Sequence, residues 1–218
     1  MNPIFIAIEG PIGVGKTSLA RAISEKYNYY LLKEIVSENP FLQHFYDNID
    51  QWAFQTEMFF LVNRFNQLEE IDKNYLQKKI SVVSDYHMFK NLLFARRTLD
   101  HYHFNKYQQI FHILNDDLPE PNLIIYLHAG VSTLLERIKK RGRDFERNMD
   151  PGYLEQLCYD YERYINKLIK EQPELPIIKI NGDKIDFVEN NDHLQYIFQK
   201  LEKVIKKELS HNEITREI

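Results

Sequence analysis

The chain is poor in several residue types and patterns, and each shortage excludes a class of protein. Only one cysteine, Cys158, occurs among 218 residues, so no internal disulfide can form and the reducing cytoplasm is the expected location. The apolar run Ile4–Ile8 has no basic flank, which favours a buried strand over a signal peptide. No other run is long enough to span a bilayer, and we expect no membrane partner.

The chain also lacks a strong charge of either sign. It has 28 basic and 32 acidic residues, a formal net charge of −4 and no long block of like charge. This balance does not favour a nucleic-acid partner, although a small anion in a local basic pocket remains compatible with it. The length and the 44% apolar content predict one domain, residues 1–218, with a full core.

Short apolar runs alternate with longer segments of helical period. This alternation predicts an α/β fold in which a five-stranded parallel sheet carries helices on both faces. The expected strands are Ile4–Ile8, Tyr29–Leu32, Ile80–Ser84, Leu123–Leu127 and Ile177–Ile180. The expected helices are Lys16–Lys26, Ile49–Leu68, Lys90–Leu114, Ser132–Lys140 and Tyr153–Lys170.

Glycine is scarce, and three of the 7 glycines fall within IEGPIGVGKTS, residues 8–18. Glycines 10 and 15, followed by Lys16 and Thr17, have the spacing of a phosphate-binding loop between a strand and a helix. Amides of such a loop and the helix N-terminus bind polyphosphate. Lys16 is expected to reach the β- and γ-phosphates of ATP, and the Thr17 hydroxyl to ligate Mg²⁺.

Arginines near residue 140 and one acidic residue complete a phosphoryl-transfer pattern. Arg137 and Arg141 are four residues apart, on one face of a helix that Gly142 is expected to end. Arg143 would then lie on a mobile lid, at about 141–149. Glu34 follows the second strand, which we expect beside the first. It would therefore lie at the carboxyl ends of the strands, where ligands bind in such sheets. Its carboxylate can accept the proton of an attacking hydroxyl.

Motifs in order along residues 4–187 resemble the deoxynucleoside kinase family, which has the P-loop kinase fold. They are GPIGVGKTS, Glu34-Ile-Val with Asn39-Pro, Trp52-Ala-Phe-Gln55, Asp85 with Phe94-Ala, and Arg137-Ile-Lys-Lys-Arg-Gly-Arg143. Within the family, residues 84–95 with FYDN and DDLPEPN most resemble the deoxyguanosine kinases of Gram-positive bacteria. The resemblance implies a homodimeric salvage enzyme that transfers the γ-phosphoryl of ATP to the 5′-hydroxyl of a purine deoxynucleoside.

The same resemblance implies a role for each matching residue. Catalysis falls to Glu34 as the base, with Lys16 and Arg137. Tyr46 and Glu146 would hold the sugar 3′-hydroxyl. Gln55 would form two hydrogen bonds with the base edge, Arg64 would lie near the base, and Phe54 and Phe94 would pack against its ring. Asp85 would serve Mg²⁺ with Thr17. The ATP site would comprise Gly10, Gly13, Gly15, Lys16, Thr17, Ser18, Arg141 and Arg143.

One departure from the family pattern concerns the segment after the third strand. Asp85-Tyr86-His87 stands where most members have an arginine after the acidic residue. We expect Lys90 to supply the missing positive charge. A cation or amide donor beside the base pocket also suits guanine, whose O6 and N7 atoms are acceptors.

Three alternatives stay open. The acceptor could be deoxyadenosine or deoxycytidine. A thymidylate-type monophosphate kinase shares the loop and lid, but Glu34 and Glu38 would repel an acceptor phosphate. A nucleotide-dependent switch would read guanine through an Asn-Lys-x-Asp element, and the chain has none.

Overall fold

The computed structural model describes residues 3–214, and the side chains of residues 3–206. Five strands form one parallel sheet: β1 Phe5–Glu9, β2 Tyr30–Leu32, β3 Val82–Ser84, β4 Leu123–His128 and β5 Ile177–Asn181. The predicted strands and the α/β class are confirmed, with bounds shifted by at most two residues. The order across the sheet is β2-β3-β1-β4-β5.

The position of β2 corrects one expectation. β3 pairs with both β1 and β2, so the strand that precedes Glu34 does not lie beside β1. The long connection between β2 and β3 lets the chain return and insert β3 between them. The carboxyl ends of β1, β3 and β2 still lie along one edge, where ligands bind in doubly wound sheets.

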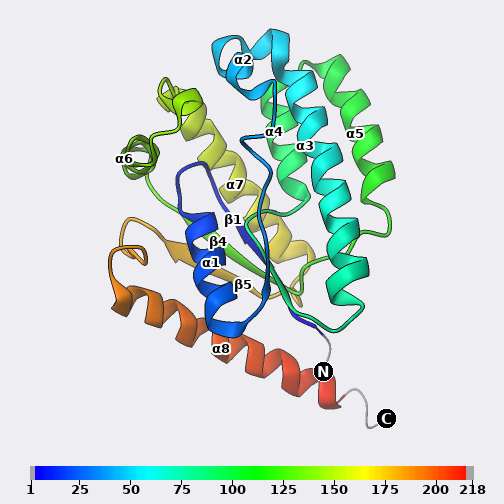
Figure 1. Cartoon of the computed structure of the whole chain (residues 1–218), viewed down its shortest axis with the longest axis vertical. Coiled ribbons are helices and arrows are strands. Elements are labelled where there is room, and N and C mark those ends of the chain that lie inside the picture. The colour runs from blue at the N-terminus through cyan, green and yellow to red at the C-terminus, as the bar shows by residue number, and fades with distance from the viewer. Residues whose placement is uncertain (1–2, 215–218) are drawn as a thin grey trace.

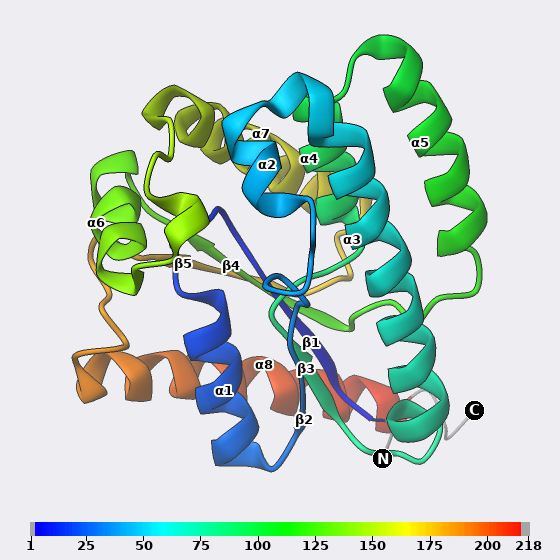
Figure 2. The ribbon, with the colours of Figure 1, turned by 45° about the horizontal axis from the view of Figure 1, so that its top comes forward.

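Helices cover both faces of the sheet. Figures 1 and 2 place α1 (Lys16–Tyr27) and α8 (Asn191–Ile214) on one face, and α4 (Phe89–Thr98) and α7 (Pro151–Glu171) on the other. Helices α3 (Ile49–Ile71) and α5 (His101–Asn115) stand beside α4. The remaining elements are α2 (Leu42–Asp47), α6 (Val131–Arg141), the π-helical turn η1 (Asp72–Leu76) and the 3₁₀ turn η2 (Asp144–Glu146).

Three helical assignments differ from the sequence patterns. The segment 90–114 is two helices, because Leu99 is extended and Asp100 caps α5 through a hydrogen bond from the His103 amide. The sequence patterns do not predict α2 or α8, because polar residues are so frequent in both segments that no apolar helical period stands out. No helix among residues 3–214 combines the length and apolarity required to cross a membrane.

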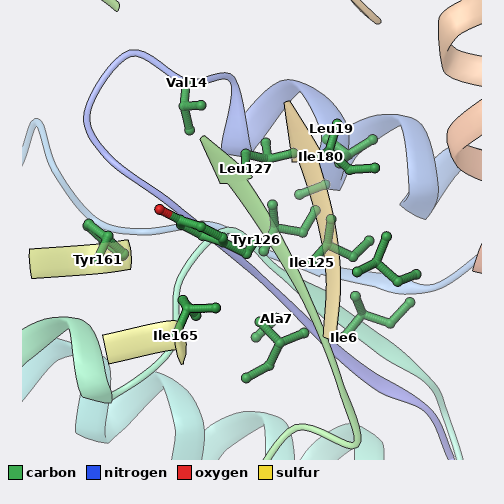
Figure 3. Close-up of a cluster of buried hydrophobic side chains, with 14 of the residues drawn as sticks. Ile6, Ala7, Val14, Leu19, Ile125, Tyr126, Leu127, Tyr161, Ile165 and Ile180 are labelled. Carbon is green, nitrogen blue, oxygen red and sulfur yellow. The ribbon is translucent and has the colours of Figure 1, made fainter. Parts of the chain in front are cut away.

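The core lies where helices meet the sheet, and alternate strand residues face opposite layers. Figure 3 shows Tyr126 of β4 directed toward Tyr161 and Ile165 of α7, while Ile125 lies on the side of Leu19 from α1. The Tyr126 and Tyr161 rings stack with centroids 6.3 Å apart. This packing fixes β1 and β4, and therefore the loop that follows β1.

Candidate active site

The glycine loop between β1 and α1 has the conformation that a phosphate site needs. Gly10, Gly13 and Gly15 all have positive φ, a region that residues with a Cβ rarely adopt. A Cβ on Gly10 would lie 2.1 Å from the Leu127 carbonyl oxygen. The loop therefore packs closely against β4. Its backbone amides lie next to the N-terminus of α1, where phosphates bind in loops of this kind.

Lys16 lies across this loop. Its ammonium donates to the carbonyl oxygens of Gly10, at 2.6 Å, and Pro11, at 2.9 Å. Burial, together with the nearby charge of Lys90, lowers the pKa of Lys16 to about 7. An anionic phosphate would favour the protonated form, so polyphosphate is a suitable ligand for this lysine.

One cavity of about 530 Å³ joins the loop to the predicted acceptor side. Its wall includes the P-loop, Glu34 after β2, Asp85 after β3, Lys90 on α4, and the arginines of α6 and the lid. Most of the predicted ATP-site residues line it. The cavity-lining residues from the predicted set are Gly13, Gly15, Lys16, Thr17, Ser18, Glu34, Asp85, Lys90, Arg137, Arg141 and Arg143.

Glu34 is the centre of a buried ionic cluster in this cavity. Lys90 donates to both carboxylate oxygens, at 2.9 and 2.7 Å, and Arg64 donates through Nε, at 3.1 Å, and through Nη2. Burial alone would raise the pKa of Glu34, but the charges of Lys90 and Arg64 outweigh it and hold the pKa below its usual range. Glu34 is therefore ionised and held in one orientation.

Lys90 lies beside Glu34, as expected of the cation that replaces the absent arginine. It is 6% exposed, and its ammonium lies 5.3 Å from the centre of the Phe94 ring. The Tyr86 side chain, at the position of the absent arginine, points into the core and donates to Gln67 Oε1 at 2.8 Å. The positive charge beside Glu34 thus comes from α4 and α3.

Asp85 joins the P-loop to the acceptor side. Its carboxylate accepts hydrogen bonds from the Thr17 hydroxyl and, at 2.7 Å, from the Glu34 amide. Burial and the Glu34 charge raise the pKa of Asp85. Thr17 and Asp85 are hard oxygen donors that face the same cavity, which suits Mg²⁺ bound mainly through water and phosphates.

The lid arginines are paired with an acidic residue. Gly142 ends α6 in a left-handed conformation, as expected, and Arg141 Nε donates to Glu146 at 3.1 Å. Arg143 lies 3.6 Å from the same carboxylate. Arg137 instead donates to the carbonyls of Val14, at 3.3 Å, and Gly182, at 2.8 Å, which ties α6 to the P-loop.

Tyr46 and Glu146 come together although they are 100 residues apart. The Tyr46 ring stacks on Phe145, with centroids 6.1 Å apart. Burial, with a contribution from the Glu146 charge, raises the pKa of the Tyr46 hydroxyl. The structure thus brings together the two groups that the family resemblance assigns to the sugar.

Helix α3 does not bring all its predicted site residues to one face. Gln55 is exposed, whereas Arg64 is buried. The nine residues between them make about two and a half turns, so the two side chains project from opposite sides of the helix. Phe54 contacts the His103 ring, with centroids 5.2 Å apart. The buried polar residue on the Arg64 side is Glu57, which is 2% exposed.

Two further acids, Glu57 and Glu9, are buried near the site and do not belong to the predicted set. Glu57 lies seven residues before Arg64, about two full turns, and this spacing was the available signal. Glu9, at the end of β1, accepts hydrogen bonds from the amides of Gly10 and His87 and from the Tyr161 hydroxyl. It links the P-loop to the segment after β3 and to α7.

Known proteins are similar to this chain in sequence and in fold. The family described as "Deoxynucleoside kinase" matches residues 6–206. A deoxyguanosine kinase of Bacillus subtilis is 49% identical over 201 residues, covering 92% of this chain and 97% of its own. A deoxyadenosine kinase of Lactobacillus acidophilus is 29% identical and covers 93% of this chain and 96% of its own.

A solved structure similar to this chain also comes from a deoxynucleoside kinase. The deoxyadenosine kinase of M. mycoides, determined with dCMP and dCDP, superposes with a TM-score of 0.79. It is 25% identical in sequence, and the match covers 92% of this chain and all of that one.

Proposed function

This chain belongs to the deoxynucleoside kinase family, and we propose that it transfers the γ-phosphoryl group of ATP to the 5′-hydroxyl of deoxyguanosine. The observation that carries the choice of base is the 49% identity, over nearly the whole of both chains, to a deoxyguanosine kinase. The α/β fold with its P-loop and the cavity that Glu34 shares with Lys16 support the reaction type.

In the proposed reaction the P-loop amides and Lys16 hold the β- and γ-phosphates. Glu34 accepts a hydrogen bond from the 5′-hydroxyl and orients its oxygen toward the γ-phosphorus. Phosphoryl transfer passes through a loose transition state in which positioning and charge stabilisation dominate. A strongly ionised Glu34 fits this chemistry, because the proton needs an acceptor only as the new bond forms.

Thr17 and Asp85 would hold Mg²⁺, which supplies charge neutralisation on the phosphates when bound. Tyr46 and Glu146 would bind the 3′-hydroxyl and so fix the sugar. The pairing of Glu146 with Arg141 and Arg143 keeps these arginines beside the cavity. Phosphate binding would draw them, with Arg137, toward the transferring group.

We also propose that the whole chain acts as one domain with a lid at about 141–149, and as a homodimer. Apolar side chains on the outer faces of three helices support an interface. They are Val62 on α3, Tyr102 and Ile113 on α5, and Tyr159 and Ile169 on α7, all exposed in the single chain. Cytoplasmic location belongs to the same proposal.

A substrate panel tests the proposed activity. Labelled ATP and Mg²⁺ are incubated in turn with each deoxynucleoside and each deoxynucleoside monophosphate. The expected result is transfer to deoxyguanosine with the highest kcat/KM, and none to monophosphates. Preference for deoxyadenosine, the substrate in the names of two relatives, would correct the base. Transfer to monophosphates only, or ATP hydrolysis without an acceptor, would contradict the proposal.

A further inference from the structure

Glu57 is a buried carboxylate that the reaction described above does not use. Its one hydrogen bond in the described part of the chain joins it to the Thr98 hydroxyl, at 3.1 Å. Burial raises the pKa of Glu57 to about 7, against the charge of Arg64. Glu34, in contrast, has two cationic partners in direct contact. A buried acceptor with so few donors requires an explanation.

Two tyrosine hydroxyls on neighbouring helices are buried polar groups as well. The hydroxyls of Tyr107 on α5 and Tyr153 on α7 are buried and have no hydrogen-bond partner among the side chains and backbone that the structure describes. Tyr107 belongs to the buried cluster against which Phe54 and Met58, which flank Glu57 on α3, pack. The Glu57 charge adds to the effect of burial in raising the pKa of both tyrosine hydroxyls. Unsatisfied buried polar groups gathered from three helices indicate a place that a polar ligand completes.

Helix α4 connects this region to the catalytic cluster. Lys90, Phe94 and Thr98 are spaced four residues apart and share a face. Lys90 contacts Glu34 at one end of this face, and Thr98 contacts Glu57 at the other. The separation along the helix axis is about 12 Å, which a deoxynucleoside spans with its sugar at Glu34 and its base beside Phe94.

The order of donors and acceptors along α3 matches one base edge. A carboxylate offers only acceptors, and the Arg64 guanidinium offers only donors. Three of the five Arg64 N–H groups serve Glu34 and Asn91, which leaves two. Guanine presents the complementary order of one acceptor, O6, and two donors, N1–H and the 2-amino group. Adenine and cytosine instead present an amino donor next to a ring-nitrogen acceptor.

We propose that Glu57, and not Gln55, reads the base, accepting hydrogen bonds from N1–H and the 2-amino group of guanine while Arg64 faces O6. This assignment rests on the proposed function and specifies which residue selects the base. It makes Glu57 a specificity residue, since it contacts the base and no reacting atom.

The test is Glu57→Gln, assayed with deoxyguanosine, deoxyinosine and deoxyadenosine. Deoxyinosine keeps N1–H and lacks the 2-amino group, so its comparison with deoxyguanosine isolates one hydrogen bond. The kcat/KM for deoxyguanosine is expected to fall about 10- to 100-fold, the range for a lost bidentate contact. The wild-type preference for deoxyguanosine over deoxyinosine should shrink toward one, and relative activity with deoxyadenosine should rise.

Matched variants separate selection from folding. Glu70→Gln makes the same change at an exposed position of α3 and should leave both ratios unchanged. Because glutamine is neutral and of the same shape, the thermal midpoint of ligand-free Glu57→Gln should equal or exceed that of the wild type. Wild-type activity with deoxyguanosine, measured first, tests the proposed function separately. Equal deoxyguanosine-to-deoxyinosine ratios in wild type and Glu57→Gln, or a ratio that changes only in Gln55→Ala, would overturn the assignment.

Discussion

Glu34→Gln is expected to lower kcat by about 10² or more, the range for a lost proton acceptor, while KM for the nucleoside changes little. The amide keeps the size of the carboxylate but not its charge. It cannot take the proton of the 5′-hydroxyl as the new bond forms. Steady-state kinetics with saturating ATP measure the effect, and an unchanged kcat would remove Glu34 from the mechanism.

The same substitution should also destabilise the protein. Arg64 is 3% and Lys90 6% exposed, and both lose their counter-ion. Breaking a buried ion pair on one side costs about 3–5 kcal/mol. The double variant Glu34→Gln with Lys90→Met removes one stranded cation and should regain part of the stability without regaining turnover. Recovery of turnover in the double variant would show that the single variant failed through folding.

Lys16→Ala is expected to lower kcat/KM for ATP by about 10²–10³, the range for removal of one group that stabilises transition-state charge. Deoxynucleoside binding, measured by calorimetry without ATP, should be unchanged, because Lys16 lies on the donor side of the cavity. Lys26→Ala is the matched control on α1, since Lys26 pairs with Glu202 at the other end of the helix. If Lys16→Ala lowered the deoxynucleoside affinity as much as kcat/KM for ATP, the result would indicate a misfolded loop.

Local patterns were enough to predict the strands and the phosphate loop. Each strand is a short apolar run, and the glycines before Lys16 have a spacing with one well-known use. The predicted position of β2 was wrong because strand order depends on contacts between distant residues. The apolar run Tyr30–Leu32 could pair with β1 or with β3, and its sequence does not distinguish the two. The break at Asp100 was missed because the helical period continues through it.

The site residues show the same division. The residues of the phosphate loop and the lid could be predicted because they belong to short motifs of consecutive residues. Gly142, for example, ends α6 because it adopts a left-handed conformation. Residues of α3 depend on which face of the helix is buried, and the aromatic side chains around Gln55 obscure that face. The stripe through Ala53, Glu57, Leu61, Arg64 and Leu68 becomes visible only when α3 packs against α4. The spacing of Glu57 and Arg64 puts them on one face of α3, but only the structure shows that this face is buried.

The central claim is that the phosphate loop and Glu34 face one cavity and pass a phosphoryl group directly between their ligands. A bisubstrate compound, with adenosine joined to the 5′-oxygen of deoxyguanosine through a polyphosphate chain, tests this most directly. The claim predicts competitive inhibition against both ATP and deoxyguanosine, with an affinity above that of either substrate. Competition with ATP alone, while deoxyguanosine still binds, would contradict it.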